Sequence, residues 1–487
     1  MTENTVLARF ADEWLDNWLK SQNRKPLILR GARQVGKSFL VRQLAKRNKR
    51  DLAEINFEAN PKLGKLFETN EPKNILMVLE QEFQKKLGPE SILFFDEIQA
   101  SPSAIAALRY FYELYPHIPV LAAGSLLEFA LQELQFSMPV GRISFLWIYP
   151  LRFREFLRAR QKDILLDAVT AVVNNKNTVS NIKYLAKTGH AALLRELALY
   201  AFTGGMPEAI CILLKKLNDN NTQNQALSEV STVHQEILIS YRSDFSKYRK
   251  RIPLEILHAV LDSLPQLVGQ AKIKYSNITK EYRSEIVRKA IDCLESAGVV
   301  KKVSLSRATG IPIGASEDSS VFKLLPLDIG LFISQTFEHP NAIRPVENLF
   351  EKWTQGNTFE RAWLGQIAEV LVGQALTSQL QSGQRLHYWL REGKSANAEV
   401  DYLMQYGTNI LPVEVKAGAS GSLRSLNTLM AEKELKQAIR FDLNYPSQQE
   451  IDIHCATGDN KNARAKYTLH NYPLYFADWW DELAAKL

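Results

Sequence analysis

Short apolar runs and helical spacings alternate along the first quarter of the chain. Apolar runs at 27–29, 92–95 and 118–123 are bounded by polar residues and predict buried strands, and the mixed segment 52–57 looks like another strand. Apolar residues at helical spacing lie between them, at 39–45 and at 74–86, and predict helices. Strands that alternate with helices are typical of a parallel sheet, so we expect an α/β fold here.

The turn after the first predicted strand carries the pattern Gly-x-x-x-x-Gly-Lys-Ser. With a strand before it and a helix after it, this pattern predicts a P-loop, although a chance glycine-rich turn is the alternative. The backbone N–H groups of such a loop surround a phosphate chain. Lys37 would reach the β- and γ-phosphates of ATP, and the Ser38 hydroxyl would hold Mg²⁺. The predicted nucleotide-binding residues are Gly31, Ala32, Arg33, Gln34, Val35, Gly36, Lys37, Ser38 and Phe39.

Two carboxylates, Asp96 and Glu97, follow the buried run at 92–95. Ligands of open α/β sheets bind at the carboxyl ends of the strands. Asp96 is therefore expected to hold Mg²⁺ through water, and Glu97 to polarise the attacking water. The pair could instead cap the next helix, but the upstream P-loop favours the ATPase interpretation. After the next strand, Ser125 could sense the γ-phosphate, cap a helix, or do both.

Length and composition indicate how many domains the chain can form and in which cellular compartment we expect it. With 487 residues, 46% of them hydrophobic, the chain is long enough for about three domains with cores of their own. Its three cysteines lie far apart in the sequence, which fits a reducing cytoplasm better than a disulfide framework or a zinc site. Residues 1–19 mix charges among apolar positions, unlike a signal peptide, and no apolar run approaches about 18 residues. We therefore expect a cytoplasmic protein with no membrane partner.

Five segments carry a family resemblance: RGARQVGKS, ILFFDEIQ, LAAGSLLEF, GRISFLWIYPLRFREFL and TGGMPEAI. The chain resembles, over nearly its whole length, a group of AAA-type prokaryotic ATPases. That group carries a C-terminal domain of unknown function, itself similar to PD-(D/E)XK nucleases. The resemblance implies an AAA+ P-loop ATPase core at 1–155, a helical lid at 156–234, a winged-helix-like domain at 235–345 and a nuclease-like α/β domain of restriction-endonuclease type at 346–487.

The resemblance also implies an arginine at Arg142, after the expected sensor strand. Such an arginine could act as an arginine finger, which stabilises charge on the transferring phosphoryl group from a neighbouring subunit. A plain surface arginine is the alternative. The first interpretation implies a homo-oligomer.

Positive charge is concentrated in residues 241–310, which carry 14 Lys and Arg against 7 Asp and Glu. Two predicted helices at 253–264 and 281–297 precede strand-like segments at 299–305 and 321–325. This order favours a winged helix, which can place a helix in the DNA major groove. Acidic residues on the second helix, and the use of winged helices as spacers, keep a non-DNA role open. The expected phosphate contacts are Lys247, Arg249, Lys250, Lys301 and Lys302.

A hairpin is predicted at 399–417, with Gly407-Thr408 as its two-residue loop. Counting back from the loop pairs Asp401 with Glu414, and Glu399 with Lys416. Because side chains alternate along a strand, these four share one face, and we expect the opposite face to be apolar. The apolar face would consist of Val400, Tyr402, Val413 and Val415.

Asp401 followed by Glu414-Val415-Lys416 has the spacing of a PD-(D/E)XK metal site. Asp401, Glu414 and Glu369, from the preceding helix, would bind Mg²⁺ or Mn²⁺, and Lys416 would orient the attacking water. A half-buried hairpin with a cross-strand ion pair is the alternative. Val400 also stands where the motif's name has proline.

The function we predict is Mg²⁺-dependent ATP binding and hydrolysis, coupled to DNA binding through 241–310 and to DNA cleavage if the C-terminal site is active. The alternative is an ATP-driven signalling or partner-remodelling switch whose C-terminal domains bind protein and cleave nothing.

Overall fold

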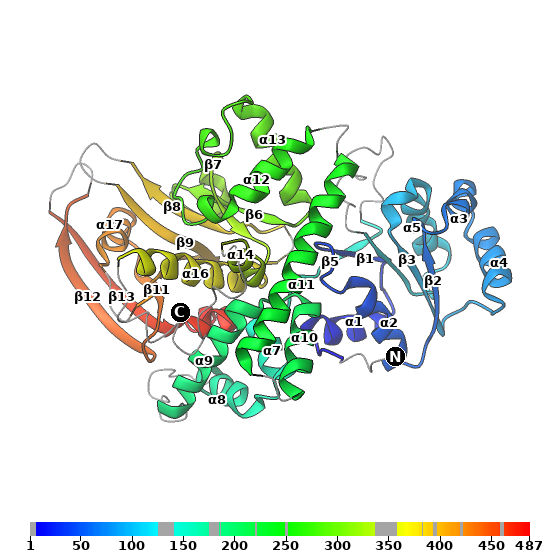
Figure 1. The fold of residues 1–487 in the computed structure, drawn as a ribbon, viewed down its shortest axis with the longest axis horizontal. Coiled ribbons are helices and arrows are strands. Elements are labelled where there is room, and N and C mark those ends of the chain that lie inside the picture. Colours follow the sequence, from blue (N-terminus) through cyan, green and yellow to red (C-terminus); the bar gives the residue numbers. More distant parts are fainter. Residues whose placement is uncertain are drawn as a thin grey trace. The chain divides into compact units, whose positions relative to one another are not determined.

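The computed structural model describes residues 6–124, 141–174, 185, 187–219, 222–248, 252–336, 358–381, 383–392, 397–418, 422–457 and 462–487, with the side chains of 248 and 358–361 left aside. The chain divides into two compact units, which are described separately (Figure 1). One comprises Met1–Tyr149 with Cys293–Val299, and the other Pro150–Asp292 with Val300–Leu487.

The first unit is built on a parallel sheet of five strands in the order β2-β3-β4-β1-β5. This confirms the α/β fold with a parallel sheet. The strands are β1 (Leu27–Arg30), β2 (Asp51–Asn56), β3 (Ser91–Asp96), β4 (Val120–Ala123) and β5 (Ser144–Trp147). The helices are α1 (Phe10–Lys20), α2 (Lys37–Arg47), α3 (Pro61–Gly64), α4 (Pro72–Phe83) and α5 (Pro102–Leu114).

Alternate residues of these strands pack on opposite sides of the sheet. Phe95 of β3 belongs to a core that includes α4 and α5, and its ring meets the rings of Phe67 and Phe111 edge-on at 5.2 and 6.0 Å. Helix α2 contacts β2, β3 and β4. All six residues of β3 are buried, which is why its sequence shows a continuous apolar run and no alternation.

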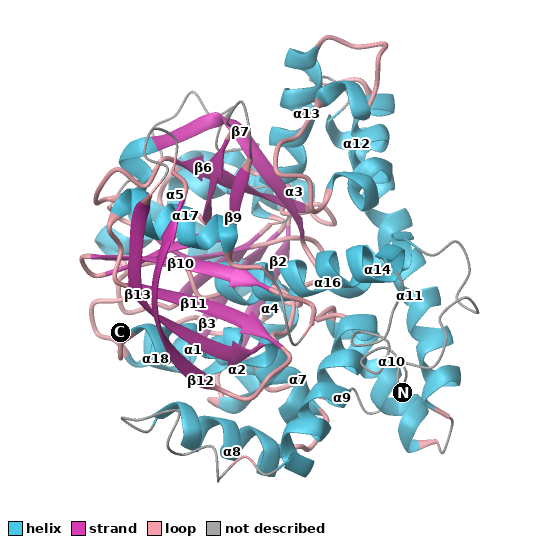
Figure 2. Ribbon diagram, turned by 90° about the vertical axis from the view of Figure 1, so that its left-hand side faces the viewer, coloured by secondary structure: helices cyan, strands magenta, loops and turns pink. Residues whose placement is uncertain are grey.

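The second unit combines helices with a mixed sheet of eight strands in the order β12-β13-β11-β10-β9-β8-β6-β7. Its strands are β6 (Val300–Ser306), β7 (Glu317–Pro326), β8 (His387–Arg391), β9 (Ala398–Tyr406), β10 (Asn409–Val415), β11 (Gln437–Asp442), β12 (Ser447–Cys455) and β13 (Ala463–Pro473). Helix α17 (Arg424–Lys433) packs on this sheet through Leu426, Leu429 and Met430 (Figure 2).

The remaining helices of the chain lie mostly before this sheet in the sequence. They are α7 (Phe153–Ala159), α8 (Asp163–Asn174), α9 (Lys187–Thr203), α10 (Pro207–Asn218), α11 (Gln223–Asp244), α12 (Leu254–Leu267), α13 (Ser284–Ser296), α14 (Ile329–Thr336), α16 (Thr358–Thr377) and α18 (Trp480–Ala484). The end of α13, from Cys293, belongs to the first unit. No helix within the described ranges is long and apolar enough to cross a membrane.

The hairpin β6–β7 is an edge of the large sheet. Two helices, α12 and α13, do precede an antiparallel hairpin, as the sequence predicts for residues 253–325. However, β6 pairs in parallel with β8, through Ser304 with His387 and Leu305 with Tyr388. The predicted boundary at 345–346 therefore falls between strands of one sheet. Neither a separate winged helix nor a restriction-endonuclease-like domain is confirmed.

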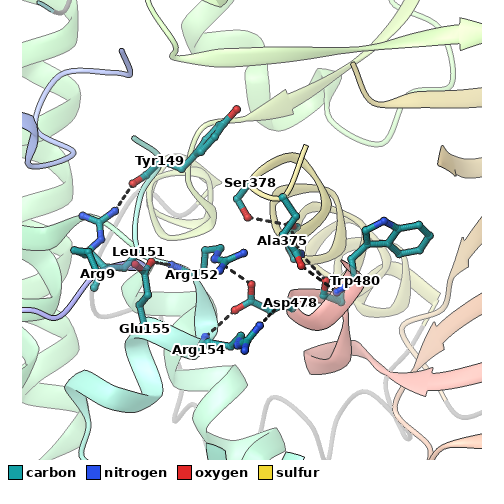
Figure 3. A network of polar contacts seen from close by, with 12 residues as sticks. Arg9, Tyr149, Leu151, Arg152, Arg154, Glu155, Ala375, Ser378, Asp478 and Trp480 are labelled. Carbon is teal, nitrogen blue, oxygen red and sulfur yellow. Dashed lines mark hydrogen bonds and ion pairs between the residues drawn. The ribbon is translucent and has the colours of Figure 1, made fainter. Parts of the chain in front are cut away.

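A buried aspartate, Asp478, joins the start of α7 to the end of the chain (Figure 3). Its carboxylate accepts a 2.8 Å hydrogen bond from the backbone N–H of Arg154 and lies 3.4 Å from Nε of Arg152. Arg154 donates to Glu482 of α18 at 2.9 Å, and its guanidinium lies over the Trp479 ring. Burial raises the pKa of Asp478, and Arg152 opposes that shift. Hydrogen bonds and ion pairs thus connect the start of α7 to a segment about 320 residues later in the chain.

Replacing Asp478 with alanine should lower the free energy of unfolding by about 1–3 kcal/mol, because the half-buried Arg152 loses its counter-charge and the backbone N–H of Arg154 loses its acceptor. Asp452→Ala is the control, since Asp452 pairs with Arg464 at the exposed surface, and we expect little change. Urea denaturation of both variants measures the difference. An equal loss of unfolding free energy in both variants would show that the Asp478 contacts stabilise the protein no more than an exposed ion pair does.

Candidate functional site

The predicted P-loop joins β1 to α2 through two glycines with positive φ. Gly31 has φ 137°, and a Cβ built there would lie 2.2 Å from the backbone oxygen of Ile148. Gly36 has φ 94° and is the N-cap of α2. Both positions need a residue without a Cβ, one for space and both for backbone conformation. The loop conformation therefore explains why glycine stands at positions 31 and 36.

Lys37 is the first residue of α2, and its side chain turns back to the loop. Its ammonium donates to the backbone oxygens of Gly31 at 2.9 Å and Ala32 at 2.7 Å. Burial lowers the pKa of Lys37 to about 8, while Glu97 and Asp96 favour its charged form. A cation is therefore held at the helix start, where a phosphate chain is also attracted.

Ser38 and Asp96 bring the P-loop and the end of β3 together. The Ser38 hydroxyl lies 3.1 and 3.0 Å from the two carboxylate oxygens of Asp96. Burial raises the pKa of Asp96, and the Ser38 hydrogen bond opposes that shift. A hydroxyl and a carboxylate are hard oxygen donors. Mg²⁺ is usually bound by a few such protein groups and keeps several of its own water ligands. The pair fits the predicted Mg²⁺ position.

Glu97 follows β3 in a left-handed conformation, with φ 50°. A non-glycine residue in this conformation is strained, and such strain is concentrated at functional sites. Its carboxylate accepts a 2.6 Å hydrogen bond from the side-chain amide of Gln99. Gln99 was not predicted as a site residue. Its signal in the sequence is its place two residues after the acidic pair.

Arg9 is a second residue that the sequence analysis did not assign to the site. It lies before α1 and is buried; its guanidinium donates to the backbone oxygens of Val35, at 3.2 Å, and Tyr149, at 2.6 Å (Figure 3). One side chain thereby ties the P-loop to the segment after β5. Nothing in the local pattern around residue 9 indicates this, because both acceptors are backbone atoms far away in the sequence.

The two remaining predicted residues of the ATP site have different outcomes. Ser125 lies outside the described residues. Arg142 is exposed, and its Nε lies 3.2 Å from Glu113, which also pairs with Arg109. The action of Arg142 from a neighbouring subunit stays a prediction.

The C-terminal hairpin has the register that the sequence predicts. Tyr406 pairs with Asn409, and Tyr402 with Val413. The predicted pairing of Asp401 with Glu414 stays a prediction, and the Asp401 carboxylate accepts a 2.7 Å hydrogen bond from the backbone N–H of Val415. However, Tyr402 does not share the environment of Val400, which packs in the core with α17. The Tyr402 ring lies near the Lys323 ammonium, and its hydroxyl donates to the backbone oxygen of Glu369 at 2.8 Å, so its predicted assignment to the apolar face is wrong. The β8–β9 pairing shifts register between His387 and Trp389, and this irregularity breaks strict alternation along β9.

Three carboxylates meet beside this hairpin: Glu369 of α16 with Glu399 and Asp401 of β9. Their oxygens lie within 4.8 Å of one another. The predicted ligand Glu414 is not in this group and pairs with Lys416. Burial raises the pKa of Glu414, and Asp401 adds to that shift. The cluster's own cation is Lys323 of β7, which contacts Glu369 and Glu399 at 2.5 Å each.

Four basic residues of the described part of 241–310 pair with acidic residues of the same region. Lys302 pairs with Asp292, and Lys247 lies 3.7 Å from Asp244. Arg242 and Lys289 also have acidic partners. Of the other predicted phosphate contacts, Lys301 lies half-buried on β6, and Arg249 and Lys250 fall outside the described residues.

Three family models match successive parts of the chain. An AAA domain matches residues 23–157, and two domains of unknown function, DUF8612 and DUF4143, match residues 194–340 and 364–458. No curated protein matches the chain. The AAA match contains the whole P-loop and the acidic pair and supports an AAA-type P-loop ATPase. The other two matches assign no activity.

Several solved structures are similar at low identity. A Walker-type ATPase of Pyrococcus abyssi is 15% identical, with 68% of this chain and 96% of that chain covered and a TM-score of 0.42. The ORC2 protein of Aeropyrum pernix, in ADPNP and ADP complexes, is 14% identical, with 69% and 95% covered and a TM-score of 0.36. The RuvB Holliday junction branch migration motor of Thermotoga maritima is 15% identical, with 61% and 90% covered and a TM-score of 0.29.

Gly31→Ala should distort the P-loop, because the new Cβ would meet the backbone oxygen of Ile148 in a conformation that alanine rarely adopts. We expect a loss of about 1–3 kcal/mol in the free energy of unfolding and at least a tenfold loss in affinity for an ATP analogue (order-of-magnitude estimates). Gly88→Ala is the control, since a Cβ there meets nothing within 4 Å. Thermal unfolding and fluorescent-nucleotide titration measure both effects; equal behaviour of the two variants would contradict this geometry.

Proposed function

We propose that the first unit binds and hydrolyses ATP with Mg²⁺. The observation that carries this proposal is the contact of Ser38 with Asp96, 3.0 Å at its shortest, beside the Lys37 ammonium. A phosphate-binding loop, a cation, a hydroxyl and two carboxylates are the groups that phosphoryl transfer to water needs. Here they come from two strands and the start of one helix.

Each group has a role that follows from its chemistry. The backbone N–H groups of residues 31–38 bind the phosphate chain, and the Lys37 ammonium offsets its negative charge. Ser38 and Asp96 would hold Mg²⁺, which, when bound, neutralises charge on the β- and γ-phosphates. Glu97 accepts a hydrogen bond from the attacking water and orients it, and Gln99 fixes the direction of the Glu97 carboxylate.

Lys37→Ala should abolish measurable ATP binding, because the loop loses the ammonium that lies against its carbonyl oxygens and serves the β- and γ-phosphates. Glu97→Gln should bind ATP normally and hydrolyse it at least about 100-fold more slowly, because only the water-orienting carboxylate is lost. Nucleotide titration and phosphate release separate the two effects.

Glu54→Gln is a matched control for Glu97→Gln, because Glu54 lies on the neighbouring strand β2 and pairs with Arg42. Its turnover should equal that of the unchanged protein. Wild-type turnover in Glu97→Gln would remove Glu97 from the mechanism.

We further propose that ATP hydrolysis is coupled to DNA binding through the basic region at 241–310. The net positive charge of that region supports this proposal, since phosphate contacts supply most sequence-independent affinity. A partner-remodelling switch is the second candidate. It is favoured by the ion pairs that engage Arg242, Lys289 and Lys302 within the chain.

Lys247→Glu combined with Lys301→Glu tests the DNA proposal. We expect weaker binding to all duplex sequences and a salt dependence reduced by about 0.9 in log–log slope for each DNA phosphate that the variant no longer neutralises. Lys85→Glu, at an exposed lysine of the first unit, should change neither. Gel shifts at several salt concentrations give both quantities. If the unchanged protein has no affinity for DNA at low salt, the partner-remodelling candidate stands instead.

A further inference from the structure

A lysine fills the centre of the C-terminal acidic cluster. Lys323 is 3% exposed, and its Nζ lies 2.5 Å from a carboxylate oxygen of Glu369 and 2.5 Å from one of Glu399. The rings of Tyr388 and Tyr402 also face the ammonium, with centroids at 5.3 and 6.0 Å. The ammonium is thus surrounded by oxygen atoms and by the negative faces of aromatic rings.

By its oxygens alone, this cluster would suit a divalent metal ion. The carboxylate oxygens of Glu369, Glu399 and Asp401 lie within 4.8 Å of one another. Ligand oxygens at about 2.1 Å from one octahedral ion are roughly 3 to 4.2 Å apart, which is similar. Lys323 brings its charge into the same space, and a second cation a few ångströms away would be strongly repelled in a buried site. The residues present therefore do not fit a metal ion while Lys323 stays in place.

The ammonium is held there by the backbone as well as by charge. Lys323 lies in the middle of β7 and pairs with Val303 of β6, and its neighbours Phe322 and Leu324 are buried. Burial alone would lower the pKa of Lys323, but Glu369, Glu399 and Asp401 outweigh it and raise the pKa well above the usual value. The contacts with Glu369 and Glu399 thus hold the ammonium between two carboxylates.

The two sides of this cluster come from different parts of the chain. The three carboxylates lie within the segment at 364–458, and Lys323 lies within the segment at 194–340. The pattern Val321-Phe322-Lys323-Leu324-Leu325 places one charge inside an apolar run. Such a lysine is almost never fully buried unless it is paired.

We propose that Lys323 is the resident cation of this cluster, that it excludes divalent metal ions from Glu369, Glu399 and Asp401, and that these carboxylates therefore do not serve a metal-dependent hydrolase. The proposal is independent of the ATP site, whose groups all lie in the first unit.

Manganese binding tests the proposal directly. Electron paramagnetic resonance of Mn²⁺, titrated into the full chain without nucleotide, counts the bound ions. The unchanged protein and Asp401→Asn should bind Mn²⁺ identically. Lys323→Met should gain one site per chain, because the carboxylates lose their internal cation, and adding Asp401→Asn to that variant should weaken the new site at least about tenfold.

Two further variants control for charge and burial. Lys323→Arg keeps a cation in the cluster and should gain no site. Lys302→Met removes a poorly exposed lysine of the adjacent strand that pairs with Asp292, outside the cluster, and should also gain none.

Two results would overturn the proposal. One is Mn²⁺ binding by the unchanged protein that Asp401→Asn removes, and this comparison does not depend on whether Lys323→Met folds. The other is a folded Lys323→Met, judged by circular dichroism, that gains no Mn²⁺. ATP turnover measured on the same samples keeps a failure of this proposal distinct from a failure of the ATPase proposal.

Discussion

The hydrogen bonds between Ser38 and Asp96 are the contact on which the ATP site depends. Ser38 lies in the first turn of α2, after β1, Asp96 ends β3, and β4 lies between these two strands in the sheet. Parallel pairing brings the carboxyl ends of all the strands to one edge of the sheet. The groups that follow β1 and β3 therefore lie close together. The P-loop glycines, the Lys37 ammonium and the strained Glu97 are then arranged around that point.

The negative charge of the carboxylates is compensated differently at the ATP site and at the C-terminal cluster. At the ATP site the Ser38 hydroxyl contacts the Asp96 carboxylate, and the Lys37 ammonium contacts backbone oxygens and, within the described part of the chain, no carboxylate. The oxygen atoms of Ser38 and Asp96 can therefore bind a metal ion. At the C-terminal cluster the lysine contacts two of the three carboxylates directly and offsets part of their negative charge. Each of these two clusters of carboxylates needs a cation, and the difference lies in whether the chain supplies it.

Local patterns in the sequence predicted those features whose partners are close in the chain. The P-loop, the buried run of β3 and the register of the β9–β10 hairpin follow from spacing over a few residues, and the structure has all three. Lys323 could not be placed in the same way. Its position depends on the pairing of β6 with β8, which joins residues more than 80 apart, and no local pattern encodes that choice.

Two misplaced or missed residues follow the same logic. Tyr402 was assigned to the wrong face because the shifted β8–β9 register breaks an alternation that was counted from the hairpin loop alone. Arg9 was missed because both of its acceptors are backbone oxygens, which any residue type supplies. Side-chain chemistry was therefore predictable where the residue types themselves are selective, as at the P-loop and the acidic pair.

The central claim is that the loop around Lys37 binds the phosphates of ATP. The most direct measurement is a crystal structure of the chain with Mg²⁺ and a non-hydrolysable ATP analogue. We expect that the Lys37 ammonium leaves the backbone oxygens of Gly31 and Ala32 and lies about 2.7–2.9 Å from phosphate oxygens, with Ser38 and Asp96 at the metal ion. An analogue bound elsewhere, or Lys37 still donating to both backbone oxygens beside a bound analogue, would contradict this claim.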